Sequence, residues 1–412
     1  MKKNYKEISS CEVCGKGFTG DSVLNLGMHA LCDDLVAIGE VRSCEMYPIE
    51  IYYCSNCGTA HQRFQVPKTE LFKGSYHYRA RFTADVLNGM KEFVASCKNK
   101  CGNLIGKKVL DIGCNDGSLL NIFKQEEAIT FGVEPTEACE EARTAGHIAY
   151  KEFINIDLAQ KILEIHGKQD FITFTNVFAH IENLDEVLSA LKILMHDNTF
   201  LVIENHYLGA VLNGNQFDTF YHEHPRTYSY KSFSFIAKSL GMTLLDVEFP
   251  ARYGGNIRVF LGGDSCNIDA ITTPKNNIPY EGDFSLKFDM LAKKVASWRL
   301  EKREYLKDLS YKFGKLNAKA FPGRAAILVK LLNLDESIFE AIYEKPGSLK
   351  VGHYVPGTRI PILSDDLLDA GDKRAPLINM AWHIPSEIRA YLDGLGYEGE
   401  VEDILSQDYF KS

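Results

Sequence analysis

The densest group of ionisable side chains in the chain is the segment Tyr221-His222-Glu223-His224, which aromatic residues flank and Pro225 follows. Histidine has an unperturbed pKa of about 6.5, so it serves as a general base at neutral pH without special tuning. The segment therefore predicts proton-transfer chemistry, with His222 and His224 as candidate bases. A metal bound by these two histidines and Glu223 is an alternative, because an extended segment would point both rings to the same side.

The remaining histidines have fewer chemically active neighbours in the sequence. His180, in the run VFAHI, fits a functional or a structural role equally well. We expect His166, His196 and His206 to be hydrogen-bonded structural residues, and the aromatic residues beside the Tyr221–His224 segment to be packing residues.

Two Cys-x-x-Cys pairs lie near the N-terminus, Cys11-Glu-Val-Cys14 and Cys54-Ser-Asn-Cys57, and a glycine follows each pair. Two such knuckles supply four thiolates, which bind zinc tetrahedrally and leave no open coordination position. The pattern predicts a structural zinc ion held by these four cysteines. Cys32 and Cys44 lie between the pairs and are spare candidates. A redox function would explain one pair but not two.

A candidate cofactor loop follows a buried strand over 107–113, with the sequence Asp111-Ile112-Gly113-Cys114-Asn115-Asp116-Gly117, and it opens a helix. Glycines let a ligand approach the backbone, and the helix start offers N–H donors. Glu134 ends the next strand, where a carboxylate accepts the hydroxyls of a ribose. We add Asn176, at the end of a strand over 170–177, to the cofactor-binding candidates.

Two cofactors compete for this loop. A dinucleotide site has the pattern G-x-G-x-x-G, with the pyrophosphate over the helix start. Here the middle glycine is absent, and the acidic Asp111 and Asp116 flank the loop. Acidic neighbours favour a cationic cofactor without phosphate, and S-adenosylmethionine has this chemistry. A strand–turn–helix without any ligand is the remaining alternative.

Strands and helices alternate from 107 to about 262, which predicts an α/β fold with a parallel sheet covered on both faces. The runs 243–249 and 256–262 follow one another without a long helix, so we expect them to pair antiparallel at the sheet edge. Residues 284–316 have a helical, charged pattern. A second, smaller α/β pattern begins near 320, and we find no internal repeat.

Composition narrows the class of protein. The chain has 412 residues, 45% of them hydrophobic and 25% charged, which allows two to four globular domains. The net charge of −9 argues against a nucleic-acid partner. The N-terminus has no apolar run of a signal peptide, and no stretch approaches ~18 apolar residues, so we expect no membrane span. Eleven cysteines in a large chain indicate a reducing, cytoplasmic setting.

With these residues in place, the chain resembles the S-adenosylmethionine-dependent sugar C-methyltransferases that act on nucleotide-linked 4-keto-deoxysugars. The resemblance covers nearly the whole length. The motifs that carry it are VLNLGMHALCDDL and VPKTELFKGSYHY, then DIGCNDGSLL, FGVEPT, FTNVFAHIENL and FDTFYHEHPRTYS, and finally VGHYVPGTRIPIL and INMAWHI.

The resemblance implies three domains and a substrate. We expect a zinc-binding module over 1–70, a Rossmann-like class I methyltransferase core over 71–265, and a C-terminal α/β domain over 266–412 that includes a long linking helix. The implied partner is a nucleotide-linked sugar substrate. We expect the protein to be a monomer or a small homo-oligomer.

The resemblance also implies catalytic roles. By position, His224 is the base that removes a proton next to the ketone, and the resulting enolate carbon takes the methyl group. The residues expected around the substrate in the same pocket are Tyr221, Glu223, His180, and one of Tyr76 and Tyr78.

The third domain departs from the family at one loop. The family has a glycine-rich GYGA-type loop followed by a lysine, whereas the run 321–330 keeps only Gly323 of the glycines, with Ala325, Ala326 and Lys330. Two other functions therefore stay open. One is an O- or N-methyltransferase for a sugar or other polar metabolite, and the other is a binding or scaffold protein with a relict methyltransferase core.

Overall fold

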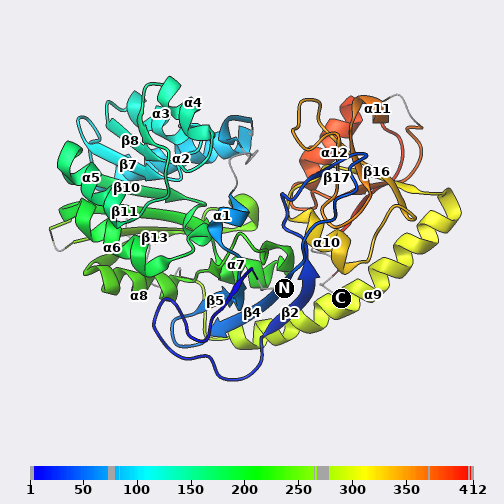
Figure 1. The fold of residues 1–412 in the computed structure, drawn as a ribbon, viewed down its shortest axis with the longest axis horizontal. Helices are drawn as coiled ribbons and strands as arrows, with labels where there is room; N and C mark the ends of the chain where they lie inside the picture. Colours follow the sequence, from blue (N-terminus) through cyan, green and yellow to red (C-terminus); the bar gives the residue numbers. More distant parts are fainter. Residues whose placement is uncertain are drawn as a thin grey trace.

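The computed structural model describes residues 4–72, 79–82, 84–263, 265–266, 278–369, 372–406 and 409. Figure 1 shows two halves, each built on a parallel β-sheet, which N-terminal strands and one long helix join along one side. In the described ranges, no helix has both the length and the apolar character needed to cross a membrane.

The first half is built on a seven-stranded sheet with the order β13-β14-β11-β10-β7-β8-β9. The strands from β7 to β11 are mutually parallel, whereas β14 pairs antiparallel with both β11 and β13. The predicted antiparallel edge pair is thus confirmed. The strands are β7 (Lys108–Ile112), β8 (Ile129–Val133), β9 (Ile148–Tyr150), β10 (Gln169–Thr175), β11 (Met195–His206), β13 (Thr243–Glu248) and β14 (Asn256–Gly262).

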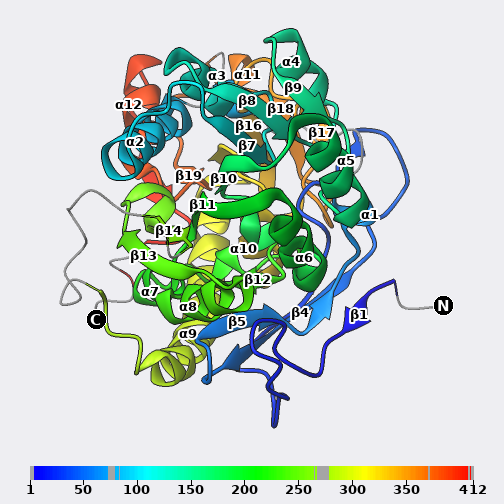
Figure 2. The same cartoon turned by 90° about the vertical axis from the view of Figure 1, so that its left-hand side faces the viewer.

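Helices cover both faces of this sheet, as Figure 2 shows. One face packs against α2 (Ala84–Cys101) and α3 (Ser118–Gln125). The other packs against α5 (Ile156–His166), α6 (Leu184–Leu194) and α8 (Tyr230–Leu240). The start of α8 is fixed by a capping box, in which the Ser229 side chain accepts from the amide of Ser232 and the Ser232 side chain accepts in return. The small helix α4 (Ala138–Thr144) packs beside α3.

The N-terminal strands contact both halves. A four-stranded sheet has the order β12-β5-β4-β2, and its edge strand β12 comes from the first half. By contrast, β3 pairs with β17 at the edge of the C-terminal sheet. The elements are β1 (Lys6–Glu7), β2 (Leu24–His29), β3 (Val36–Ala37), β4 (Tyr47–Cys54), β5 (Thr59–Gln62), β6 (Phe64–Gln65), α1 (Lys68–Leu71), η1 (Ala80–Phe82) and β12 (Arg226–Thr227).

The C-terminal sheet has the order β20-β19-β15-β16-β18-β17-β3, and its first five strands in this list are parallel. Counted along the chain, the five parallel strands of each half have the same order, 5-4-1-2-3. The elements are α9 (Phe284–Phe313), β15 (Leu316–Lys319), α10 (Ala325–Leu331), β16 (Phe339–Glu344), β17 (His353–Tyr354), β18 (Pro361–Ser364), α11 (Asp366–Asp369), β19 (Leu377–Asn379), α12 (Pro385–Gly394) and β20 (Val401–Asp403).

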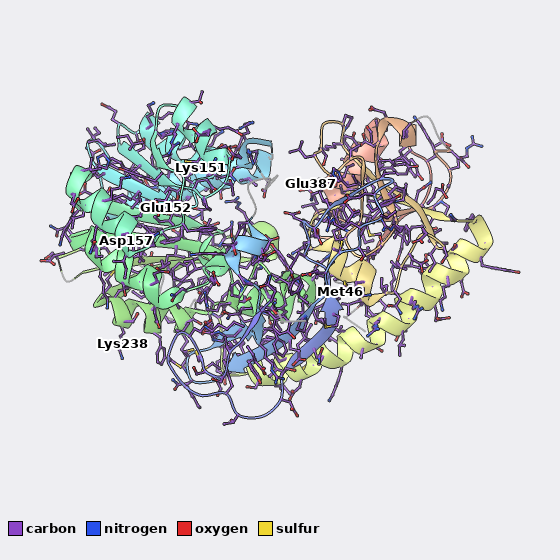
Figure 3. The ribbon with its side chains drawn as sticks, viewed as in Figure 1. Met46, Lys151, Glu152, Asp157, Lys238 and Glu387 are labelled. Atoms are coloured by element: carbon purple, nitrogen blue, oxygen red, sulfur yellow. The ribbon has the colours of Figure 1, made fainter. Side chains whose placement is uncertain are left out.

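The helix α9 and the N-terminal segment around Met46 also link the parts of the molecule. The helix α9 runs beneath both of them in Figure 1, and it buries Trp298 and Phe288. Met46, labelled at the lower centre of Figure 3, lies against Gly357 of the C-terminal half. Short helical segments complete the region between the sheets: η2 (Phe178–His180), α7 (Leu208–Asn213), η3 (Phe217–Thr219) and η4 (Arg252–Gly254).

Candidate active site

The four predicted zinc ligands come together. Their sulfurs lie within 4.8 Å of one another, with Cys11 Sγ 3.3 Å from Cys57 Sγ and Cys14 Sγ 3.6 Å from Cys54 Sγ. A tetrahedral ion with Zn–S bonds of about 2.3 Å places its sulfurs about 3.8 Å apart, so the set fits zinc. The prediction of a four-cysteine zinc site is confirmed.

The glycine after each cysteine pair closes its knuckle. Gly15 and Gly58 both have a φ of +74°, and their amides donate to the carbonyls of Cys11 and Cys54. A left-handed φ favours glycine. At Gly58 a side chain would also collide with the protein, because an added Cβ would lie 2.5 Å from Ser229 Oγ at the start of α8.

The first zinc knuckle is linked by a buried ion pair to the residue that follows the Tyr221–Pro225 run. Glu12, inside the knuckle, pairs with Arg226, whose side chain is fully buried. The Arg226 guanidinium also donates to the carbonyls of Ile181 and Glu182, just after His180. The zinc module therefore supports the chain on both sides of the histidine cluster.

The cofactor loop lies at the carboxyl end of β7, as predicted. Gly113 has a φ of +75°, and an added Cβ would lie 2.5 Å from Val177 Cγ2. Gly117 has a φ of +81°, and an added Cβ would lie 3.1 Å from Ala142 Cα. Both positions require glycine, because their φ values are left-handed and a side chain would collide with Val177 or Ala142.

Glu134 follows β8 and lies beside the loop. Its carboxylate accepts from the amide of Asn115 at 3.1 Å and from the amide of Thr136 at 2.9 Å. An ionised carboxylate has about four acceptor positions, so two remain for the hydroxyls of a ribose. The arrangement fits the predicted cofactor.

The loop also binds the segment that precedes α2. The Asn115 side chain accepts from the amide of Ala80 at 3.1 Å, and Asp116 accepts from the amide of Arg81 at 3.1 Å. This anchors the chain just after Tyr76 and Tyr78, which themselves lie outside the described residues.

Asp111 is the buried acid of the loop. Its carboxylate is 3% exposed and accepts from Thr173 Oγ1 at 2.7 Å. Burial raises the pKa of Asp111 to about 7, and the nearby Glu134 adds to the increase, while the Thr173 hydroxyl opposes it. A buried acid with one neutral donor is suited to a cationic ligand, which would supply the missing opposite charge.

Asn176 follows β10, the strand beside β7. Its φ is +54°, its amide donates to the Glu204 carbonyl at 2.7 Å, and its side chain accepts from Asn256 at 3.3 Å. Adjacent parallel strands end at the same edge of a sheet, so Asn176 and the Gly113 loop share the edge where ligands bind in such folds.

The Tyr221–His224 segment is a turn, in which the His224 amide donates to the Tyr221 carbonyl at 2.9 Å. The segment is not extended, as the alternative of a metal bound by His222, Glu223 and His224 requires, and the two histidines have different surroundings. His222 contacts the Tyr47 carbonyl at 3.2 Å, whereas the His224 ring lies 4.7 Å from the His180 ring. In the described part of the chain, no metal-type cluster forms around them, and the four cysteines are the one such group.

His224 is the centre of an aromatic cluster. Its ring centroid lies 4.3 Å from that of Tyr221 and 5.5 Å from that of His206. Its Nδ1 lies 2.9 Å from the Thr219 carbonyl. A carbonyl only accepts, so Nδ1 carries the proton and Nε2 carries the lone pair. Burial, with His180 and His206 nearby, lowers the pKa of His224 well below its usual range. The ring is therefore a neutral base.

His180 is held in the same way. Its Nδ1 donates to the Glu223 carbonyl at 2.7 Å, and burial lowers the pKa of His180 to about 4. The Phe72 ring packs edge-on against it at 5.5 Å. The backbone of the predicted catalytic segment thus orients the second predicted histidine.

Tyr221 and Glu223 point toward the C-terminal half. Burial, with Asp33 nearby, raises the pKa of Glu223 well above its usual range, and Lys350 opposes the increase. Burial, with Glu223 nearby, also raises the pKa of Tyr221. In both groups the raised pKa favours the protonated form, which is a hydrogen-bond donor.

Sequence reasoning did not assign three residues of this region. We expected His206 to be structural, yet it ends β11 and lies in the histidine cluster. Its place at the end of a predicted strand was the available signal. Arg226 contacts the carbonyls of Ile181 and Glu182, and Arg324 contacts Thr219 from the C-terminal half. No local pattern predicts either contact.

Family comparisons cover most of the chain. Three family models match it, and they are described as a zinc binding domain over residues 11–72, a methyltransferase domain over 81–247, and a C-methyltransferase C-terminal domain over 253–400. The boundaries that we predicted at 70 and 265 remain predictions.

Relatives agree with this domain order. The C-methyltransferase NovU of Streptomyces niveus is 25% identical over 394 residues, which cover 94% of this chain and 93% of NovU. The ubiquinone biosynthesis O-methyltransferase of Escherichia coli is 30% identical over 96 residues, which cover 22% of this chain and 39% of that protein.

Among solved structures, the magnesium protoporphyrin IX methyltransferase of Synechocystis, with bound SAH, has a TM-score of 0.33 and 18% identity and covers 44% of this chain and 82% of that chain. The three successive domain matches and the full-length relative NovU together indicate the family. The chain belongs to the S-adenosylmethionine-dependent C-methyltransferases that begin with a zinc-binding module.

Proposed function

We propose that the enzyme transfers a methyl group to the carbon next to the ketone of a nucleotide-linked 4-keto-deoxysugar, with His224 as the base that forms the enolate. The sugar substrate is inferred from the motif resemblance. The base is inferred from one observation, the hydrogen bond from His224 Nδ1 to the Thr219 carbonyl, which leaves Nε2 as an acceptor.

The residues proposed to hold S-adenosylmethionine surround the carboxyl ends of β7 and β8. Asp111 and Glu134 are the proposed acidic contacts, and Gly113, Asn115 and Gly117 are the proposed contacts from the loop, where the glycines let the cofactor approach the backbone. Asn176 is the proposed contact from β10. When bound, the cofactor supplies a methyl group on a sulfonium, which is the electrophile of the reaction.

Side chains of this protein carry out the proton transfer. A carbon becomes nucleophilic when the proton next to a ketone is removed, and a neutral buried histidine accepts that proton at Nε2. His224 is neutral because burial and its histidine neighbours disfavour the charged ring. Its Nδ1 contact to Thr219 stays in place through the transfer, and it stabilises the imidazolium that forms.

The developing enolate oxygen needs a donor. Tyr221 lies against His224, and Glu223 is in the same turn with a raised pKa, so both are proposed as donors to the substrate oxygen. His180 is proposed to relay or stabilise charge beside them. Tyr76 and Tyr78, outside the described residues, remain proposals from the resemblance.

A turnover screen tests the substrate. Purified enzyme is incubated with a panel of 4-keto nucleotide sugars and S-adenosylmethionine, and products are checked by mass for the gain of one CH2 group. Nuclear magnetic resonance then locates the new methyl group. A methyl on oxygen or nitrogen, or no product from any 4-keto sugar, would contradict the proposal.

Solvent exchange tests the base. With the accepted keto-sugar and an unreactive cofactor analogue in heavy water, the wild type exchanges the proton next to the ketone. We expect His224→Gln to lower the exchange rate and kcat by about 10²- to 10⁴-fold. His196→Gln is the matched control. His196 lies at the start of β11, whereas His206 of the histidine cluster ends that strand, and His196 pairs with Asp170 at 3.4 Å. Undiminished exchange in His224→Gln would remove His224 as the base.

A further inference from the structure

The loop after β15 sends one arginine across to the methyltransferase half. Arg324 Nε lies 3.2 Å from Asp218 Oδ2, and Arg324 Nη1 donates to Thr219 Oγ1 at 3.4 Å. The two side chains are nearly solvent-free, at 10% exposure for Arg324 and 0% for Asp218. A buried ion pair is costly to desolvate, so its presence between the two halves requires a compensating function or an exact fit.

A second residue of the C-terminal half completes the contact. Trp382 Nε1 donates to the same Asp218 oxygen at 2.8 Å, and the Arg324 guanidinium lies 5.2 Å from the centre of the Trp382 ring. Arg324 follows β15 and Trp382 follows β19, the two adjacent strands at which the sheet order reverses. The ends of both strands therefore converge on η3.

The contact leads directly to His224. Asp218 and Thr219 are consecutive residues of η3, and the Thr219 carbonyl accepts from His224 Nδ1 at 2.9 Å. Arg324 thus holds the side chains of the very turn whose backbone carbonyl sets the ring orientation and the tautomer of His224. No other described residue forms an ion pair with Asp218.

We propose that Arg324 is a positioning residue, which clamps η3 from the C-terminal half so that the Thr219 carbonyl keeps His224 oriented with its proton on Nδ1. The proposal rests on the proposed function of His224 as the base. It also gives a physical reason for the departure at residues 321–330, because an arginine there makes an interdomain contact that a glycine-rich loop lacks.

Three variants and a control test this assignment. Arg324→Gln removes the charge and leaves Asp218 buried without its cation, so the double variant Asp218→Asn with Arg324→Gln removes both charges and protects the fold. Arg324→Lys keeps the charge without the planar fork. Arg374→Gln is the matched control, because Arg374 is 82% exposed in a surface pair with Glu398.

We expect both Gln variants to lower kcat by about 100-fold with little change in KM, because a small displacement of a catalytic group costs about this much. Arg324→Lys should recover part of the loss, and Arg374→Gln should match the wild type. A rise in KM with unchanged kcat would make Arg324 a substrate-binding residue and overturn the proposal. Unchanged kcat in the folded double variant would also overturn it.

A measurement without substrate separates this proposal from the proposed function. In ¹⁵N-histidine spectra of the free enzyme, the His224 signal is identified by its loss in His224→Gln. We expect the wild type to show the Nδ1-protonated tautomer and the double variant to show a mixture of tautomers. An unchanged tautomer overturns the clamp. If no ketosugar is turned over, the proposed function fails while this spectrum still decides the role of Arg324.

Discussion

The two parallel sheets of this protein have the same strand order but different loops after their first strand. In the methyltransferase half, the loop after β7 has Gly113 and Gly117 in left-handed conformations, close to neighbouring side chains. In the C-terminal half, the loop after β15 carries Phe321, Pro322 and Arg324, and Arg324 contacts the other half. Two loops at the same position of one topology thus differ in role: the loop after β7 belongs to the proposed cofactor site, and the loop after β15 contacts the other half.

The buried charges of the two sheets differ in the same way. Asp111 on β7 has the hydroxyl of Thr173 as its partner and a raised pKa. At the end of β15, Lys319 Nζ lies 2.6 Å from Asp365, which also accepts from Tyr391 at 2.8 Å. The buried acid without an opposite charge lies in the proposed cofactor site, whereas the paired charge lies in the core of the C-terminal sheet.

Removing zinc should have the largest effect, because the zinc module pairs with the methyltransferase half through β12 and contacts the C-terminal half through β3 and Met46. Structural zinc contributes about 10–16 kcal/mol to small zinc-binding folds. We expect a chelator to abolish turnover. Of the chain's two tryptophans, Trp298 lies in α9 and Trp382 follows β19 in the C-terminal half. We therefore expect the unfolding midpoint measured by tryptophan fluorescence in denaturant to change little when zinc is removed.

Glu12→Gln is the matched variant for zinc removal. It keeps the four thiolates but removes the charge that pairs with Arg226. We expect zinc content to stay unchanged and kcat to fall. Normal kcat in this variant would show that the knuckle supports the fold without positioning the histidine cluster.

Lys319→Met tests the paired charge of the C-terminal sheet. The variant leaves Asp365 buried without its cation, which should cost about 3–5 kcal/mol in the free energy of unfolding. Tryptophan fluorescence in denaturant measures it. Lys315→Met, next to the same strand, removes an exposed pair with Glu340 at 3.6 Å and should cost less than about 1 kcal/mol. Equal costs would contradict the contrast between the two sites.

Gly113→Ala and Gly323→Ala compare the two loops directly. An added Cβ at Gly113 would lie 2.5 Å from Val177, whereas at Gly323 the nearest atom is Cys32 Cβ at 3.5 Å. We expect Gly113→Ala to weaken S-adenosylmethionine binding about 10- to 100-fold, which corresponds to roughly 1.4–2.7 kcal/mol. Gly323→Ala should bind normally. Calorimetry with the cofactor decides, and equal affinities would remove Gly113 from the cofactor site.

Asp111→Asn should have the smallest effect. Burial raises the pKa of Asp111 from 3.8 to about 7, so the folded state binds this proton more tightly than the unfolded state. The stability that this group contributes is present below about pH 4 and is lost as the pH rises to 7. The cofactor-free variant should therefore melt at a higher temperature than the wild type at pH 8, because its neutral amide avoids a buried charge. The difference should vanish near pH 4, and a pH-independent difference would contradict the assignment.

Much of the fold could be predicted from the sequence. The strands ending near 113, 134 and 177 lie where their apolar runs end, because the period of side-chain burial is a local property. The equal strand order of the two halves was not predicted, and no internal repeat was found. Two sheets can have the same strand order without a shared residue pattern, because different loops and core residues can form the same topology.

The candidate site was also predicted from the sequence only in part. The cysteine pairs and Gly113 were identified from spacing, because a knuckle or a strand–turn–helix is complete within a few residues. The turn at Tyr221–His224 and the contrasting surroundings of His222 and His224 were not predicted. Those depend on β5, η2 and the C-terminal half, which approach from far along the chain.

The sequence by itself determined the chemistry that is available: four thiolates for zinc, a loop for a cationic cofactor, and histidines for proton transfer. Local spacing fixes these because each motif is short and its backbone requirements are its own. Only the tertiary structure decided that His224 is neutral with its proton on Nδ1, since burial, His180 and the Thr219 carbonyl set that state. It also brought Arg324 against Asp218, a contact between residues more than a hundred positions apart that no local pattern determines.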